Sequence, residues 1–175
     1  GNKVPGYIRR LAGIMRELDD CPVVVSVRDL RAVSVSINRR ASSERDRWPA
    51  GHRAVFGIGS ALILAHALAR LPANAPVLLL PYGALAADWR TTMTTVVRHV
   101  APDVEPHFGE DRTAKLEKMK NKRGGERTPI ALDPTEEELL ELPSVVRIDE
   151  VFKGDRPFPL SQVQDAFRRF VEEVP

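Results

Sequence analysis

A four-residue apolar run, Val77–Leu80, followed by a proline at position 81, is the strongest structural signal in the chain. A short continuous apolar run of this kind is typical of a strand that is covered on both faces. An apolar helix is expected before it, over residues 61–71, and an amphipathic helix after it, over residues 85–100. Because such a strand needs helices on each side, this order predicts an α/β or α+β fold.

Further β-branched stretches predict the partners of this strand. Val23–Val27 is one such run, and apolar residues alternate with polar ones over 33–37, which is the period of a half-buried strand. We expect a hairpin turn at 28–31 between them, with one long bulged strand as the alternative. Shorter strands are expected at 104–108 and 145–148. The predicted architecture is therefore a small sheet of three to five strands packed by helices.

Other helices are marked by their periodicity and their caps. An amphipathic stripe predicts a helix over residues 7–18. Asp133 and Glu136, with a proline between them at position 134, form the signature of a capping box that opens a short acidic helix. A last amphipathic helix is expected after Ser161.

The charge is uneven along the chain, although the net charge is only +2. Residues 1–125 hold 20 Lys and Arg against 12 Asp and Glu, whereas residues 126–175 hold 6 against 12. We therefore expect a basic α/β core over 1–109, a flexible basic linker over 110–132 and an acidic C-terminal segment over 133–175. The terminal helix of that segment either docks on the core or binds a partner.

Composition excludes several classes of protein. Cys21 is the sole cysteine, which rules out an internal disulfide framework and a multi-cysteine zinc site. No apolar run approaches the roughly 18 residues that span a bilayer, and no signal-peptide core is found. We expect an intracellular, cytoplasmic protein with no cofactor and no membrane partner.

The cations are mostly arginine, 20 Arg to 6 Lys, and the planar guanidinium group binds phosphate bidentately. Arginines gather over residues 28–53, and a lysine cluster follows at 115–123. The alternative is that these charges serve solubility and pair with Glu44 and Asp46. The predicted nucleic-acid-binding residues are Arg28, Arg31, Arg39, Arg40, Arg45, Arg47, Arg53, Lys115, Lys118 and Lys122.

Two glycines precede the apolar helix. Glycines at such a place let backbone N–H groups approach a phosphate, and a helix N-terminus favours negative charge. Gly57, Gly59 and Ser60 are therefore the predicted phosphate-binding residues. The alternative is a tight strand-to-helix turn with a serine cap. The segment lacks the lysine of a P-loop, and Leu62 stands at the third glycine of a dinucleotide motif.

Four short segments follow one another in an order that is known from one family. They are Gly57–Ala61 before a helix, Val77–Pro81, Leu85–Trp89 and Ile148–Glu150. This order resembles the first RecA-like domain of superfamily-2 helicases, where a Walker A loop, a strand ending in proline, a tryptophan-bearing helix and an Asp-Glu box occur in sequence.

The resemblance covers roughly residues 53–152 and implies a RecA-like domain. Ser60 and Ala61 stand where that family has its Walker lysine and hydroxyl residue. Without the lysine, the β- and γ-phosphates lose their main charge partner. The resemblance therefore implies a degenerate relative and not a working motor.

Candidate catalytic residues are few. Asp149 and Glu150, with Lys153 nearby, are compatible with a metal nuclease. Neighbouring residues on a strand face opposite ways, however, so a solvated strand end is the favoured interpretation. The four histidines form no metal-binding spacing. We therefore predict a protein that binds and does not catalyse.

These features favour a non-enzymatic protein that binds the RNA or DNA backbone through an arginine-rich surface, as an assembly or replication factor of a virus, phage or mobile element would. Nucleic acid is the expected partner. One alternative is a nucleotide- or phosphate-binding α/β domain that uses Gly57–Ser60. Another is a protein-interaction module whose C-terminal helix contacts a protein partner or a second copy of the chain.

Overall fold

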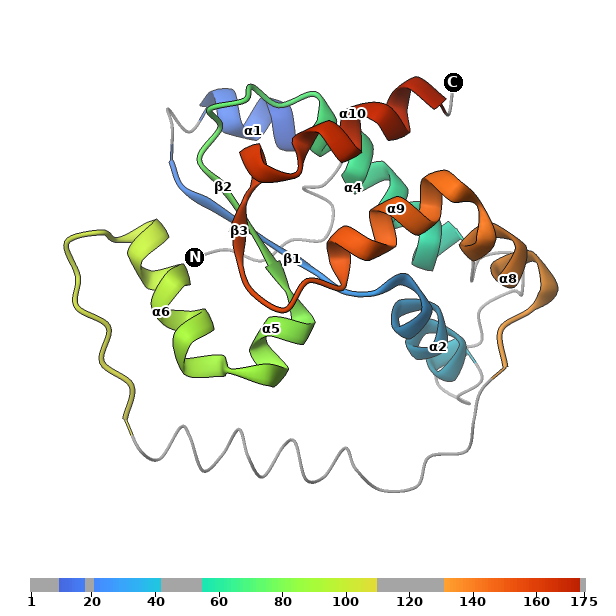
Figure 1. Ribbon diagram of the computed structural model, residues 1–175, viewed down its shortest axis with the longest axis horizontal. Coiled ribbons are helices and arrows are strands. Elements are labelled where there is room, and N and C mark those ends of the chain that lie inside the picture. The colour runs from blue at the N-terminus through green and yellow to red at the C-terminus, as the bar shows by residue number, and fades with distance from the viewer. Residues whose placement is uncertain (1–9, 18–20, 42–54, 110–130, 174–175) are drawn as a thin grey trace.

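The computed structural model describes residues 10–17, 21–41, 55–109 and 131–173 (Figure 1). The strands are β1 (Val23–Val27), β2 (Val77–Pro81) and β3 (Phe158–Pro159). The α-helices are α1 (Leu11–Glu17), α2 (Leu30–Ala41), α4 (Ser60–Ala69), α5 (Tyr82–Ala87), α6 (Trp89–Val100), α8 (Pro134–Glu141), α9 (Pro143–Phe152) and α10 (Gln164–Glu173). The fold is mixed α/β, a small three-stranded sheet packed by helices, which confirms the predicted class.

Strand β2 lies at the centre of the sheet. It pairs in parallel with β1, with Val25 opposite Leu79, and antiparallel with β3, with Phe158 also opposite Leu79. All five of its residues are buried. Because successive side chains of a strand point to opposite faces, β2 needs cover on both sides.

Helices supply that cover. In Figure 1, α6 lies on one side of the strands and α4 and α10 lie on the other. Val77 and Leu79 belong to the main core with α4, α9 and α10. Leu78 and Leu80 are also buried but point to the opposite face. The predicted apolar run is thus a strand between two helical layers.

The C-terminal residues complete the same core. The rings of Phe152 and Phe167 lie 6.2 Å apart, and Phe167 and Phe170 are buried where α10 packs on α4. The buried Gln164 amide donates to the carbonyl oxygen of Leu71 at 2.6 Å, just beyond the end of α4. The apolar stripe of the terminal helix therefore docks on the chain itself, which is one of the two predicted outcomes.

Several predicted helices are confirmed. The capping box of α8 is present, with Asp133 accepting from the Glu136 N–H at 2.9 Å and Glu136 accepting from the Asp133 N–H at 3.1 Å. The helix expected over 85–100 is two helices, because Asp88 leaves the helical conformation and caps α6. Within the described part of the chain, no helix is long and apolar enough to cross a membrane.

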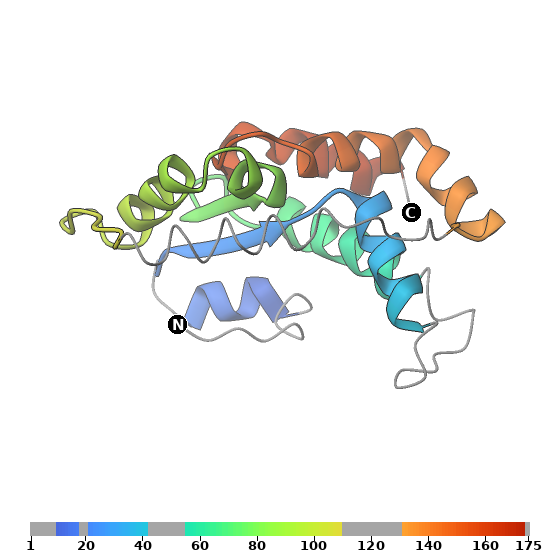
Figure 2. The same ribbon diagram turned by 90° about the horizontal axis from the view of Figure 1, so that it is seen from below.

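The predicted strand at 33–37 and the hairpin at 28–31 are wrong, because these residues begin and form α2. Asp29 accepts a hydrogen bond from the Ala32 N–H at 2.7 Å and so caps the helix. The buried face of α2 includes Ser34 and Asn38, four residues apart, and Asn38 donates to Glu136 of α8 at 2.6 Å. Figure 2 shows α2 and α8 together at the end of the molecule opposite α6.

The predicted strands at 145–148 and 104–108 are also wrong. Residues 145–148 lie in α9, which opens at Pro143 and buries Val145 and Ile148 three residues apart on one face. Residues 104–108 form no strand and follow the turn after α6. The predicted linker falls almost wholly on residues 110–130, which lie outside the described part of the chain.

Candidate functional site

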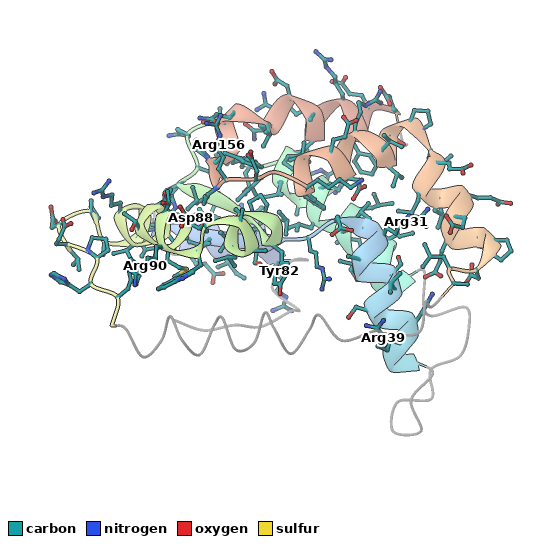
Figure 3. All side chains as sticks on the ribbon, turned by 60° about the horizontal axis from the view of Figure 1, so that its bottom comes forward. Arg31, Arg39, Tyr82, Asp88, Arg90 and Arg156 are labelled. Atoms are coloured by element: carbon teal, nitrogen blue, oxygen red, sulfur yellow. The ribbon has the colours of Figure 1, made fainter. Side chains whose placement is uncertain are left out.

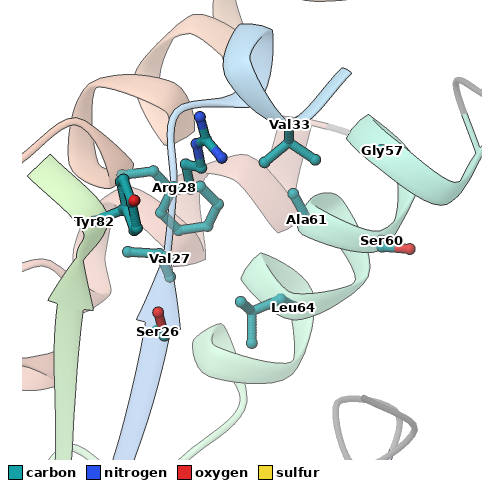
Figure 4. A pocket seen from close by; sticks show the side chains of 10 residues that line it. Ser26, Val27, Arg28, Val33, Gly57, Ser60, Ala61, Leu64 and Tyr82 are labelled. Atoms are coloured by element: carbon teal, nitrogen blue, oxygen red, sulfur yellow. The ribbon is translucent and has the colours of Figure 1, made fainter. Parts of the chain in front are cut away.

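A hollow of about 270 Å³ lies at the carboxyl ends of the two parallel strands (Figure 4). Side chains from β1, α2, α4, α5 and α9 line it. Its walls are apolar and consist of Val27, Val33, Ala61, Leu64 and Phe152. Its polar residues are Ser26, Arg28, Ser60 and Tyr82. Apolar walls with a few polar groups are the usual composition of a small-molecule site.

The chain path creates this hollow. After β1 the chain continues through α2 to α4, which packs on one face of the sheet, and after β2 it continues through α5 to α6 on the other face (Figure 1). Where the connections of neighbouring parallel strands leave to opposite faces, a crevice opens at the carboxyl ends of the strands. Ligands of open α/β sheets bind at such crevices.

Arg28 is the charged residue of the hollow. It follows the last residue of β1, and its guanidinium carbon lies 4.9 Å from the centre of the Tyr82 ring. This is the geometry of a cation–π contact. Among the described residues, no carboxylate pairs with the exposed Arg28. The ring therefore orients the guanidinium group while its charge stays available to an anion.

Arg31 is engaged elsewhere. Its guanidinium group donates to both carboxylate oxygens of Glu137, at 3.0 and 2.5 Å. This bidentate hydrogen bond raises the pKa of Arg31 above its ordinary value. The acidic C-terminal segment thus neutralises one of the predicted nucleic-acid-binding cations.

Arg39, the remaining predicted cation whose side chain the structure describes, does not line the hollow. Arg39 lies on α2 about 12 Å along the helix axis from Arg31, at 1.5 Å per residue, and Figure 3 shows the two well apart. Arg40 belongs to α2, but its side chain is outside the described part. The residues that lie wholly outside the described part are Arg45, Arg47, Arg53, Lys115, Lys118 and Lys122. Of the predicted cations whose side chains the structure describes, Arg28 alone lines the hollow.

The glycine segment has a different conformation from the expected turn. Residues 55–59 form a π-helical turn that continues directly into α4, and Gly59 has helical dihedrals of φ −56° and ψ −41°. The alternative of a tight strand-to-helix turn with a serine cap is therefore wrong. A Cβ at Gly57 would lie 3.2 Å from Ser34 Oγ, so this glycine allows close packing on α2. Gly57 and Ser60 line the hollow, although in Figure 4 the Ser60 side chain points away from Arg28. Phosphate binding by these residues stays a prediction.

Asp149 has a structural role. Its Oδ1 accepts a hydrogen bond from the Leu30 N–H at 2.6 Å, and its Oδ2 lies 2.5 Å from Lys153 Nζ. The hydrogen bond to Asp149 raises the pKa of Lys153. Within the described residues, no three His, Cys, Asp or Glu side chains form a group that could hold a metal ion. Asp149 thus joins α9 to the start of α2, two residues after Arg28.

Sequence reasoning missed Tyr82 as a site residue. It begins α5 directly after the proline that ends β2. An aromatic residue at the carboxyl end of a buried parallel strand was the available signal, because ligands bind at that edge.

Comparison of the chain with known protein families, with curated proteins and with solved structures found no match. The resemblance to superfamily-2 helicases therefore gains no support. Two of its four segments also differ in local structure, since Gly57–Ala61 is helical and Ile148–Glu150 lies in α9.

Proposed function

We propose that the protein binds single-stranded nucleic acid, with one nucleotide held at the hollow. The observation that carries this proposal is the placement of Arg28, over the ring of Tyr82, beside an apolar cavity at the carboxyl ends of β1 and β2. A nucleotide combines a flat, largely apolar base with a phosphate, and the hollow offers apolar walls next to a guanidinium group. Proteins that bind single strands combine stacking surfaces with cationic groups in this way.

A binding role agrees with how the other polar groups are used. Asp149 caps α2, and Arg31 pairs with Glu137. Arg28, by contrast, has no carboxylate partner among the described residues and lies at the hollow. A free nucleotide is the second candidate, because the same hollow and the same arginine suit it.

The proposal is tested by fluorescence anisotropy with a labelled single-stranded oligonucleotide, the corresponding duplex and a mononucleotide competitor. We expect the single strand to bind more tightly than the duplex. Replacing Arg28 by alanine should weaken binding about tenfold, the equivalent of roughly 1.4 kcal/mol, and reduce the salt slope by about one.

Two further variants make the result specific. Arg169→Ala removes the same charge from an exposed position on α10 and should leave affinity nearly unchanged. Ala61→Leu narrows the hollow and should weaken binding without a change of charge. Equal effects of Arg28→Ala and Arg169→Ala, or no binding of any strand at low salt, would overturn the proposal. Tight binding of the mononucleotide alone would favour the second candidate.

A further inference from the structure

A second aromatic cluster lies seven residues beyond Tyr82. Trp89 begins α6, and the guanidinium carbon of Arg90 lies 5.6 Å from the centre of its ring. Phe108 meets Trp89 edge to face, with ring centres 5.2 Å apart and an interplanar angle of 75°. Trp89 and Phe108 are half-buried, while Arg90 is exposed. The cluster is therefore held in place by the fold and still reaches the surface.

This cluster repeats the chemistry of the hollow. Each site pairs an arginine with an aromatic ring at the first residue of a helix, Tyr82 in α5 and Trp89 in α6. Energetically significant contacts of this kind occur roughly once per 70–80 residues, whereas here the two rings are seven residues apart. Figure 3 shows Tyr82, Asp88 and Arg90 on the same side of the molecule.

Asp88, the acidic residue between the two sites, is engaged in the helix cap. Its carboxylate accepts hydrogen bonds from the Thr91 N–H at 3.1 Å and from the Thr91 hydroxyl at 2.6 Å. The positive end of α6 offsets its charge. Asp88 therefore fixes the start of α6, and with it the position of Trp89.

We infer that a bound single strand continues from the hollow onto Trp89 and Arg90, so that the ligand is an oligonucleotide occupying two stacking sites. This inference rests on the proposed function and specifies the length of single strand that the protein binds. The two rings are separated by α5, which rises about 9 Å over its six residues, and by the extended residue Asp88, so a few nucleotides at the roughly 3.4 Å spacing of stacked bases would span them. Bases stack on aromatic rings and on guanidinium planes alike, and such stacking tolerates any sequence.

The experiment measures the affinity of the intact protein for thymidine monophosphate and for oligothymidylates of increasing length. We expect affinity to rise steeply up to about four nucleotides and to level off beyond that length. Trp89→Ala should weaken binding of the tetranucleotide about tenfold and leave the monophosphate unaffected. Arg90→Gln should act in the same direction, which covers the case in which Trp89→Ala disturbs folding.

Arg98→Gln is the matched control, because Arg98 is exposed near the opposite end of the same helix. This variant should change neither the affinity for the tetranucleotide nor the affinity for thymidine monophosphate. In a Trp48→Phe background Trp89 is the remaining tryptophan, and the tetranucleotide should quench its emission.

Two results would overturn the inference and leave the proposed function standing. One is an affinity that does not increase with length beyond the monophosphate. The other is equal effects of Arg90→Gln and Arg98→Gln. If neither the monophosphate nor any oligonucleotide binds, the proposed function fails together with the inference.

Discussion

Gly154, which follows α9, packs closely against the end of the central strand β2. A Cβ at this position would lie 2.8 Å from Phe158 Cε1 and 3.1 Å from Pro81 Cγ. We predict that Gly154→Ala lowers the free energy of unfolding by about 1–3 kcal/mol, because overpacking forces neighbouring atoms apart. Urea denaturation measures this change.

Gly13 provides the control for this substitution. It lies inside α1, where an added Cβ meets no atom within 4 Å. Gly13→Ala should therefore stabilise the protein by up to about 1 kcal/mol, since alanine is the better helix former. Equal effects of the two substitutions would contradict the close approach at Gly154.

Among the helices, α2 depends on a residue far along the chain. Asp149 accepts from the Leu30 N–H and lies beside Lys153. We predict that Asp149→Ala costs about 1–3 kcal/mol of stability, because the buried Leu30 N–H loses its acceptor. Amide exchange should rise in the first turn of α2, and the pKa of Lys153, which the hydrogen bond raises, should fall.

Glu150→Ala is the comparison, because Glu150 is the exposed neighbour on the same helix. Its effect should stay within about 0.5 kcal/mol. A similar loss of stability in both variants, with unchanged exchange in α2, would show that Asp149 does not cap that helix.

The elements that sequence reasoning could predict carry local signals. β2 is a continuous apolar run, and α8 opens with a capping box within four residues. The buried positions of α2 include Ser34 and Asn38, and the partner of Asn38 is Glu136, which lies far along the chain. Apolar periodicity cannot detect a helix whose buried face carries polar residues at two of the three fully buried positions that the structure describes.

The sequence around α9 does contain a signal for a helix, but it extends beyond residues 145–148, which by themselves predict a strand. Pro143 marks its start, and the buried spacing of Val145, Ile148 and Phe152 is helical. At the site, the cluster of arginines in the sequence correctly drew attention to Arg28. Its position beside Tyr82, however, follows from the parallel pairing of β1 and β2, after which the two residues come. Long-range placement of this kind is absent from local sequence patterns.

Over the whole molecule, the N-terminal and C-terminal parts share one apolar interior. Phe167 of α10 is fully buried among residues of both parts. We predict that Phe167→Ala costs about 3–5 kcal/mol, as is usual for a buried phenylalanine. Arg169→Ala, which changes an exposed residue of the same helix, should cost less than about 0.5 kcal/mol. Thermal denaturation distinguishes the two, and a small effect of Phe167→Ala would mean that α10 contributes little to the interior.

The position of β2 between its two partners has a consequence for biosynthesis. One partner, β1, has already left the ribosome when β2 emerges, but β3 follows only about 80 residues later. At roughly 5–20 residues per second, translation leaves one edge of an entirely apolar strand unpaired for several seconds. The nascent chain therefore passes through a period in which it is vulnerable to aggregation and suited to chaperone binding, and this period ends only when β3 has been made.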